Sequence, residues 1–415
     1  MENIIVAAEI GNAKLAVMAA RKVDDKRLHV LAVETEPTPK NCVRNGVVCK
    51  PTEVVAALNG LLKKLANRLG ASVVITKIYV GLNAHTLRTT PVSVSRSVFD
   101  GEWLTDDMLA DLEQEALRQL PAKKQVLEVS AVTYMSNDNV VAQLHDVTGG
   151  SLQVTYAVAN VDADVVDKLK QCVAQLPACA LADYLIAPKT TAELLTTPDD
   201  RQGCAVVDFG AGCTSVTVFV DGALKHFAVI PLGGQHITTD LITFGNLSEH
   251  EAESLKRQFG IKYADENTAK KYFQMADASD GTKRTLSIDD FKKVCVARLT
   301  EIVKYVMDQI AVCVPSDQLS AGLILTGGLT TMDNCAKIVA GIAGVSARIG
   351  SHAHWLTPDS VKLASHNEYA QLVGVLMQGN GGCVETQSKK KKRSGFKEII
   401  GKMGGKMEDM FSECK

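Results

Sequence analysis

The sequence predicts a two-lobed α/β protein in which each lobe is built on a β-hairpin unit with an acidic residue and a glycine turn. Glu9-Ile10-Gly11 and Asp208-Phe209-Gly210 end strand-like runs, lie 199 residues apart, and are each followed by two more strand-like runs. Such a turn is common on its own, so the repetition is the stronger observation, and a duplicated unit implies two related lobes. At 415 residues, the chain is long enough for each lobe to bury a core.

The elements of the first half follow from hydrophobic periodicity. Short strand-like apolar runs predict strands, whereas Pro51, which has no N–H to lose in a first turn, predicts the start of a helix. The predicted strands span residues 3–10, 14–20, 28–34 and 77–82, and the helix spans residues 51–69. An acidic-rich helix at 105–120 and strands at 126–135 and 152–160 then predict an inserted α+β subdomain.

The second half repeats the unit and adds a helical stretch. Strands are predicted at 205–209, 215–220 and 224–231, a mainly helical region at 249–312 with its longest periodic run at 288–310, and a strand at 321–325 before Gly327 and Gly328. We therefore expect this organisation: first lobe 1–83, with 161–196 and 355–378 returning to it; inserted subdomain 84–160; second lobe 197–235 and 315–354; its helical subdomain 236–314; a basic flexible linker 379–394; and an amphipathic helix 395–415.

Composition excludes several classes of protein. A hydrophobic fraction of 46% and a charged fraction of 22% exclude wholesale disorder and a multi-span membrane protein. The net charge of −2 argues against a surface adapted to nucleic acid, although residues 389–415 carry nine basic and four acidic side chains. The eleven cysteines include no CxxC pair, and the first residues lack the pattern of a secretory signal, so we expect reduced thiols and a cytoplasmic protein.

The two glycine turns are candidate phosphate-binding elements. A phosphate needs several converging N–H donors, and glycine permits the close approach of the backbone. Gly11-Asn12-Ala13-Lys14 and Gly210-Ala211-Gly212-Cys213-Thr214 are placed to hold a polyphosphate from opposite lobes, with Lys14 adding positive charge. Glu9 and Asp208 are placed to hold the waters of a Mg²⁺ ion. The sequence contains neither a GxxxxGK[ST] motif nor a complete dinucleotide fingerprint.

These segments resemble the FtsA family of actin-like (ribonuclease H-like) ATPases. The resemblance rests on residues 205–260, on IIVAAEIGNAKLAVM, KIYVGLNAH, LILTGGLTTM and SARIG, and on the C-terminal tail, so it spans most of the chain in the family's order. It implies ATP and Mg²⁺ in a cleft between the lobes. The implied nucleotide contacts are Gly11, Asn12, Lys14, Gly210, Gly212, Cys213, Thr214, Gly233, Gly234, Glu253, Lys256, Gly327 and Gly328.

Some of these positions leave other interpretations open. Without the resemblance, Glu253 and Lys256, one helical turn apart, would be a weak surface ion pair. Asn12, Ala211, Cys213 and Ser215 stand where relatives more often carry Thr, Gly, Thr and Asp, so we expect at most weak ATPase activity, and no catalytic residue is assigned. His352 and His354 form an isolated HxH, for which packing at the surface or in the cleft is a simpler explanation than a metal site.

The tail has the pattern of a membrane-surface helix. Its basic run, 389–393, precedes an apolar stripe at intervals of three and four residues, formed by Phe396, Ile399, Ile400, Met403, Met407, Met410 and Phe411. The segment is too charged to span a bilayer, but it suits the surface of an anionic membrane. A helix docked on its own body or on a partner, and a basic run that serves only as a solvated spacer, are the alternatives.

The resemblance implies a cell-division protein that polymerises into protofilaments and links the FtsZ ring to the cytoplasmic side of the bacterial membrane at the septum. The implied partners are the FtsZ C-terminal peptide, with Arg298 as a candidate contact, and other division proteins. The alternatives are a pilus-assembly or shape-determining actin relative and, less compatible with the basic tail, a small-molecule kinase of the same fold. A chaperone of the Hsp70 type would need more chain after Gly379 for a substrate domain.

Overall fold

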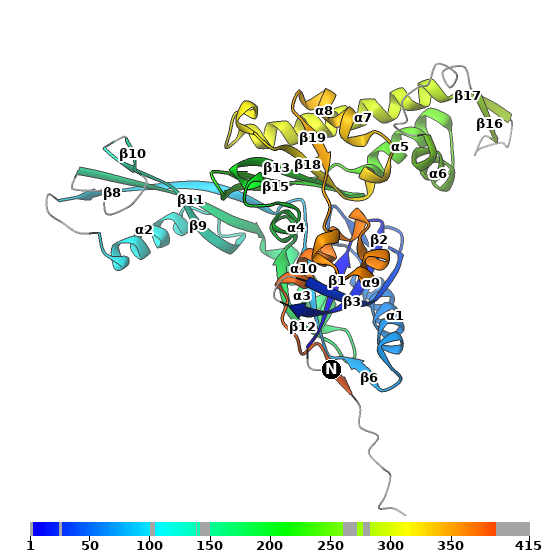
Figure 1. The fold of residues 1–415 in the computed structure, drawn as a ribbon, viewed down its shortest axis with the longest axis horizontal. Coiled ribbons are helices and arrows are strands. Elements are labelled where there is room, and N and C mark those ends of the chain that lie inside the picture. The colour runs from blue at the N-terminus through cyan, green and yellow to red at the C-terminus, as the bar shows by residue number, and fades with distance from the viewer. Residues whose placement is uncertain are drawn as a thin grey trace, which may run out of the picture.

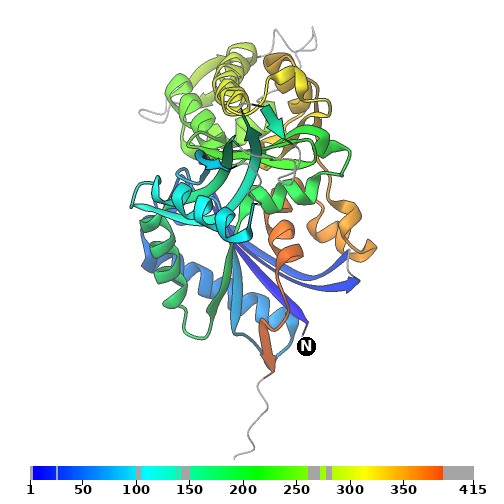
Figure 2. The ribbon, with the colours of Figure 1, turned by 90° about the vertical axis from the view of Figure 1, so that its left-hand side faces the viewer.

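The computed structural model describes residues 3–24, 27–99, 104–137, 139–141, 150–259, 272–276 and 283–386. Two lobes, each with a mixed sheet, are stacked on one another, and an inserted subdomain projects to one side (Figure 1). In the view turned by 90°, the insert faces the reader in front of the junction between the lobes (Figure 2).

The first lobe is a five-stranded sheet in the order β12-β7-β1-β2-β3. β1 and β2 form an antiparallel hairpin in which Glu9 is opposite Ala16, and β7 runs parallel to β1. The strands are β1 (Ile4–Ile10), β2 (Lys14–Asp24), β3 (Arg27–Pro37), β7 (Lys77–Leu82) and β12 (Ala180–Ile186). A small hairpin of β4 (Val43–Arg44) and β5 (Val47–Val48) follows β3.

The second lobe repeats this arrangement, as the duplicated hairpin predicted. Its strands follow the order β15-β14-β13-β18-β19, with Asp208 opposite Ser215 in the hairpin and β18 parallel to β13. The strands are β13 (Gly203–Phe209), β14 (Thr214–Val220), β15 (Ala223–Ile230), β18 (Gly322–Thr326) and β19 (Ala347–Ile349). Glu9 and Asp208 are thus the last residue but one of the equivalent strand of each lobe, β1 and β13.

Helices cover the outer face of each sheet. In the first lobe, α1 begins at Pro51, as predicted, and buries leucines spaced along one face against β2 and β3. The first-lobe helices are α1 (Pro51–Leu69) and α3 (Ala163–Ala174). In the second lobe, α7 and α8 pack on one another beside α5 and α6. These helices are α5 (Gly234–Gly245), α6 (Glu249–Phe259), α7 (Ile288–Ala311) and α8 (Cys335–Ala343).

Two crossing helices join the lobes. α10 (Ala370–Gln378) packs against β1 and β7, α4 (Ala187–Leu195) packs against β14 and β15, and the two helices cross each other. A Cβ atom at Gly374 of α10 would lie 2.8 Å from the Thr190 carbonyl oxygen, so the crossing requires glycine there. The apolar cluster around this crossing draws on both sheets and includes Ile5, Met18, Val206, Phe219 and Leu372. α9 (Pro358–Ala364) lies beside β3.

The inserted subdomain consists of a helix on a sheet that continues the sheet of the second lobe. β8 pairs with β15 at one position, Arg88 opposite Ala228, so nine strands form one sheet in the order β10-β9-β11-β8-β15-β14-β13-β18-β19. α2 packs on one face of the insert around Leu112. Its elements are β8 (Arg88–Val98), α2 (Asp106–Arg118), β9 (Lys124–Ser136), β10 (Asn139–Val141) and β11 (Gly150–Asp162).

Two predicted ranges differ in the structure. The region 249–312, predicted as mainly helical, also contains a hairpin of β16 (Tyr272–Ala276) and β17 (Lys283–Ser287). The predicted linker 379–394 includes strand β20 (Val384–Thr386), which pairs with β6 (Val73–Ile75) of the first lobe. Three residues of this range therefore extend the first lobe. The predicted tail helix, 395–415, lies outside the described residues.

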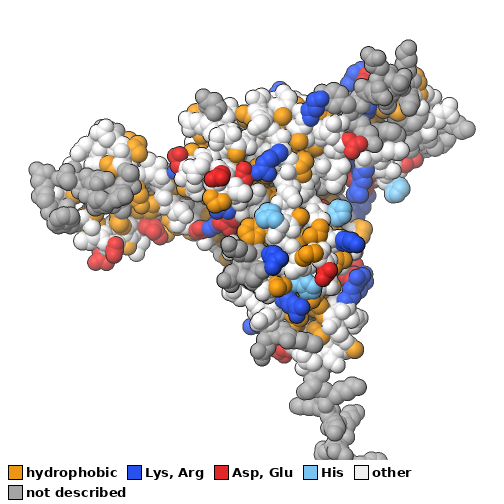
Figure 3. All heavy atoms as spheres, in the orientation of Figure 1, with side chains coloured by type: hydrophobic (Ala, Val, Ile, Leu, Met, Phe, Trp, Pro, Cys, Tyr) orange, Lys and Arg blue, Asp and Glu red, His pale blue; other side chains and the backbone are white. Residues whose placement is uncertain are grey.

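Charged side chains of both signs are interspersed on the face drawn in Figure 3. Among the helices that the structure describes, none is long and apolar enough to cross a membrane.

Candidate functional site between the lobes

The two predicted phosphate turns lie against each other across the junction of the lobes. The first turn is closed by the Gly11 N–H, which donates to the Lys14 carbonyl (3.0 Å). Asn12, at its tip, accepts a hydrogen bond from the Gly46 N–H on Oδ1 (3.0 Å). A Cβ atom at Gly212 of the second turn would overlap the Asn12 amide. The structure thus brings the turns together, and a phosphate between them requires the flexible Asn12 side chain to move.

Two carboxylates lie beneath the turns. The Oε2 atom of Glu9 is buried and has no hydrogen-bond partner among the residues that the structure describes, and burial raises the pKa of Glu9. Burial and the nearby charge of Glu9 together raise the pKa of Asp208 to about 7. Buried carboxylates that are short of partners are suited to a cation or to its waters.

Lys14 is the cation nearest to these carboxylates. Its Nζ lies 3.8 Å from Glu9 Oε2, beyond hydrogen-bond distance. Lys14 instead donates to the backbone carbonyl of Glu368 (2.6 Å), lies 3.5 Å from the Glu368 carboxylate, and sits over the Tyr369 ring at 4.7 Å. Since a quarter or less of the Lys14 side chain is exposed, the charge that surrounds it matters more than it would at an open surface.

The start of α5 and the turn after β18 complete the walls. The N–H of Gly234 donates to the Gly210 carbonyl (3.0 Å), so the beginning of α5 is bonded to the second phosphate turn. Gly327 has φ +88°, which strains other residues, and a Cβ atom there would overlap the Asp208 carboxylate. Gly327 therefore lets the turn after β18 approach Asp208. At Gly328, by contrast, a Cβ atom would meet no other atom within 4 Å.

Glu253 and Lys256 form a network in which the lysine is buried and the glutamate is partly exposed, and not the surface pair that their spacing alone suggested. Lys256 is 6% exposed, and its ammonium donates to Glu253 Oε2 (2.5 Å), Thr238 Oγ1 (2.8 Å) and the Gly234 carbonyl (3.0 Å). All three N–H donors of the ammonium are used. The network joins α6 to the first turn of α5, and a contact from either residue to ribose or base stays a prediction.

The side chains of Cys213 and Thr214 face away from the turn. Burial in the apolar core raises the pKa of the Cys213 thiol to about 12. The Thr214 hydroxyl is fully buried and donates to the Leu232 carbonyl (2.8 Å). Any contact from these two residues to a phosphate would therefore come from the backbone.

The site contains the kinds of groups that would bind a magnesium nucleotide. Glu9 and Asp208 supply carboxylate oxygens for the hydrated ion, the glycine turns supply backbone N–H groups, and Lys14 supplies a cation. A bound Mg²⁺ would offset phosphate charge. With a nucleotide in this position, the turns would hold the phosphates, and the α5–α6 network would form one wall.

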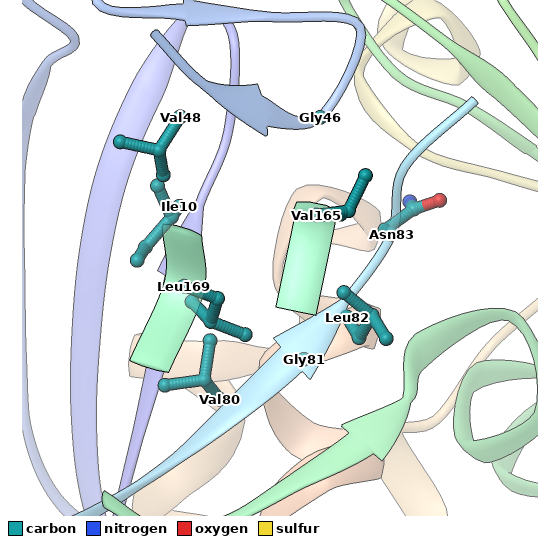
Figure 4. A pocket seen from close by; sticks show the side chains of 9 residues that line it. All are labelled: Ile10, Gly46, Val48, Val80, Gly81, Leu82, Asn83, Val165 and Leu169. Carbon is teal, nitrogen blue, oxygen red and sulfur yellow. The ribbon is translucent and has the colours of Figure 1, made fainter. Parts of the chain in front are cut away.

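A small pocket in the first lobe adjoins this site at Ile10 and Gly46. It is about 20 Å³ in volume and lies between the end of β1, the β4–β5 hairpin, β7 and α3 (Figure 4). Val48, Val80 and Leu169 are among its apolar lining residues. Such a volume holds about one water, so a nucleotide does not fit there.

Two segments that sequence reasoning missed reach the site. Thr38, after β3, donates from Oγ1 to the Gly11 carbonyl (2.7 Å), and the β4–β5 hairpin contributes the Gly46 contact to Asn12. Residues 367–369 contribute the contacts to Lys14. No local sequence pattern predicts these contacts, because they join residues that are distant in the chain. Glu368, for example, is 354 residues from Lys14.

Two further residues considered in the sequence analysis, Arg298 and His352, lie in other surroundings. Arg298 on α7 is bonded to both oxygens of Asp240 (2.6 and 2.9 Å) and to Glu301, so a partner peptide would have to compete with these acids. His352, which we expected at the surface or in the cleft, is fully buried with Nε2 bonded to the Ala364 carbonyl (2.7 Å). The predicted membrane residues 396–411 lie outside the described residues.

Comparison with known proteins places the chain beside one family. Residues 205–374 match the sequence profile described as "Cell division protein FtsA". A relative of that name from Porphyromonas gingivalis is 25% identical over 83% of this chain and 72% of its own length. Another from Pseudomonas aeruginosa is 24% identical over 91% of this chain and 89% of its own length.

Solved structures show the same actin-like fold. A PilM–PilN type IV pilus biogenesis complex matches with a TM-score of 0.64 and 16% identity, over 91% of this chain and 98% of that one. MreB5 of Spiroplasma citri bound to ADP matches with a TM-score of 0.55 and 12% identity, over 90% and 94%. A MamK double helical filament matches with a TM-score of 0.51 and 10% identity, over 90% and 98%.

Proposed function

Because this chain is similar to the FtsA family and has an actin-like fold, we propose that it binds ATP with Mg²⁺ between its lobes and tethers the FtsZ ring to the membrane. The observation that carries the proposal is the pair of equivalent hairpins, each with a glycine turn and an acidic residue, that face one another across the lobe junction. A relative of the same fold whose structure is described as bound to ADP supports a nucleotide in this position.

The proposed nucleotide lies with its phosphates between the two turns and its adenosine against Gly327 and the α5–α6 network. Glu9 and Asp208 hold Mg²⁺ through water, and Lys14 contacts the phosphates. Catalysis by phosphoryl transfer needs a positioned water and groups that stabilise developing charge. Since Cys213 and Thr214 turn their side chains into the core, neither supplies such a group, and this favours slow hydrolysis or none.

Self-association is the second part of the proposal. A similar fold assembles into a double helical filament in MamK, which supports polymerisation into protofilaments. We place the FtsZ C-terminal peptide on the helical part of the second lobe near Arg298, and we place other division proteins among the partners. We place the protein on the cytoplasmic side of the membrane at the septum, held there by the tail residues 395–415.

A pilus-assembly protein is the second candidate, because the PilM–PilN complex has the highest TM-score of the three structures described above. At 16% identity, that likeness concerns the fold alone. The sequence relatives and the family profile favour the cell-division function over it.

Calorimetry with Mg-ATP tests the nucleotide site through Gly212→Val. The new side chain meets the far end of the flexible Asn12 side chain, so we expect the fold to survive while the phosphates lose their approach. ATP affinity should fall at least tenfold, a change of about 1.4 kcal/mol. Gly341→Ala in α8, where a Cβ meets nothing within 4 Å, is the matched control. Equal ATP affinity in both variants and the parent would remove the turns from the site.

A further inference from the structure

Lys14, the cation of the first phosphate turn, is held by a segment from the far end of the chain. Residues 367–369, a single helical turn before α10, present a backbone carbonyl, a carboxylate and an aromatic ring to its ammonium. The carbonyl of Glu368 accepts at 2.6 Å, and the Glu368 carboxylate lies at 3.5 Å.

The same segment is bonded to the opposite lobe. Thr326, at the end of β18, donates from Oγ1 to the Asn367 carbonyl (3.2 Å). The Asn367 side-chain amide donates to Thr330 (3.4 Å), whose hydroxyl in turn donates to the Gly327 carbonyl (2.6 Å). The segment therefore links Lys14 of the first lobe to the turn proposed for adenosine in the second lobe.

The negative charge of Glu368 lies beside the positive charge of Lys14, which a bound phosphate would require. An ammonium interacts with an anion as a point charge, so a carboxylate and a phosphate oxygen compete for it. Glu9 is enclosed beneath the turn, with 15% of its side chain exposed, whereas 44% of the Glu368 side chain is exposed. Glu368 is thus the acid that is free to swing into solvent and leave Lys14 to a phosphate.

We propose that Glu368 is an internal competitor of the nucleotide, whose carboxylate neutralises Lys14 until a polyphosphate displaces it. This inference rests on the proposed binding of ATP. The backbone carbonyl of Glu368 and the Tyr369 ring remain as contacts when the carboxylate leaves, so Lys14 stays positioned while its charge becomes available. Removing the carboxylate charge should strengthen binding of Mg-ATP.

The test compares the parent with Glu368→Gln, which keeps the shape of the side chain and removes its charge. An ion pair of this exposure contributes up to about 1 kcal/mol, so Mg-ATP affinity should rise roughly two- to fivefold by calorimetry. Glu36→Gln is the matched control, since the Glu36 carboxylate pairs with Lys64 of α1 at 3.4 Å and not with Lys14. Glu368→Gln is also combined with Lys14→Met, and in that background its effect on affinity should disappear.

A second measurement needs no nucleotide. Acetylation of Lys14 by a small acylating reagent, followed by mass spectrometry, should be faster in Glu368→Gln than in the parent, and unchanged in Glu36→Gln. Faster labelling with unchanged or weaker ATP binding in Glu368→Gln would overturn the competition, although ATP binding by the parent would still support the proposed function. If Glu368→Gln gave the same gain in ATP affinity in the Lys14→Met background, the gain would come from general charge repulsion. That result would also overturn the proposed competition. No ATP binding by parent or variants would refute the proposed function, and with it the competition, whatever the labelling shows.

Discussion

Asp208 is expected to make the protein less stable as the pH rises, and Asp208→Asn should remove that dependence. Burial, together with the charge of Glu9, raises the pKa of Asp208 from its ordinary value of 3.8 to about 7. Between these two values the folded protein keeps the proton that the unfolded chain has lost. The folded state binds more protons there, so the free energy of unfolding falls with rising pH.

The size of the effect follows from the two pKa values. Each pH unit between about 4 and 7 lowers the contribution of Asp208 by roughly 1.4 kcal/mol, to a limit of roughly 4 kcal/mol above pH 7. Asparagine has a similar shape and does not titrate. The free energy of unfolding of Asp208→Asn, relative to the parent, should therefore increase by about 2–3 kcal/mol between pH 5 and pH 8.

Urea denaturation at pH 5, 6, 7 and 8, without nucleotide and with a chelator, measures this difference. Asp200→Asn is the control, because the pKa of Asp200 is shifted in the opposite direction. Although burial raises the pKa of Asp200, its hydrogen bonds from Thr197 and Arg348 outweigh burial and lower that pKa below its ordinary value. Asp200 therefore stabilises the fold above pH 4, and its loss should cost the same at pH 5 and pH 8. A constant difference between Asp208→Asn and the parent across this range would refute the assignment of a raised pKa to Asp208.

Two further predictions concern partners. Arg298→Glu should weaken binding of a labelled FtsZ C-terminal peptide in fluorescence anisotropy, because it puts a negative charge beside Asp240 and Glu301. Thermal stability is checked for the variant and the parent. Equal peptide binding by both would exclude Arg298 from the peptide site. The full chain should pellet with anionic vesicles at low salt, because each basic residue near the surface contributes about 1 kcal/mol to binding. A chain that ends at Gln387 and an Ile400→Glu variant should both pellet less. Equal pelleting of all three proteins would rule out the tail as the anchor.

The architecture of each lobe was predictable because it is encoded locally. Short apolar or alternating runs predicted β1, β2, β3, β13, β14 and β15, and Pro51 predicted the first residue of α1. The shared acidic residue and glycine turn predicted the duplication, and the structure confirms it with the same strand order in both lobes. The glycine turns were also found from sequence, since glycine is needed wherever backbones approach closely.

The contacts between these units were not predictable, since they join residues far apart in the chain. A helical spacing of three suggested a surface pair for Glu253 and Lys256, but the packing of α6 on α5 buries the lysine. The range predicted as linker contributes β20, because β6 has an edge to which it can pair. The insert shares a sheet with the second lobe through the single pairing of β8 with β15.

The sequence by itself determined the two related lobes, the glycine turns, the acidic residues before them and the resemblance to the FtsA family. All of these are patterns of neighbouring residues, and a local pattern fixes local structure. Only the tertiary structure decided what Lys14 and Asn12 contact. Those contacts depend on how the crossing of α4 and α10 sets one lobe against the other, which places Glu368 on Lys14 and Asn12 on Gly212. Side chains hundreds of residues apart meet there because packing, and not sequence spacing, brings them together.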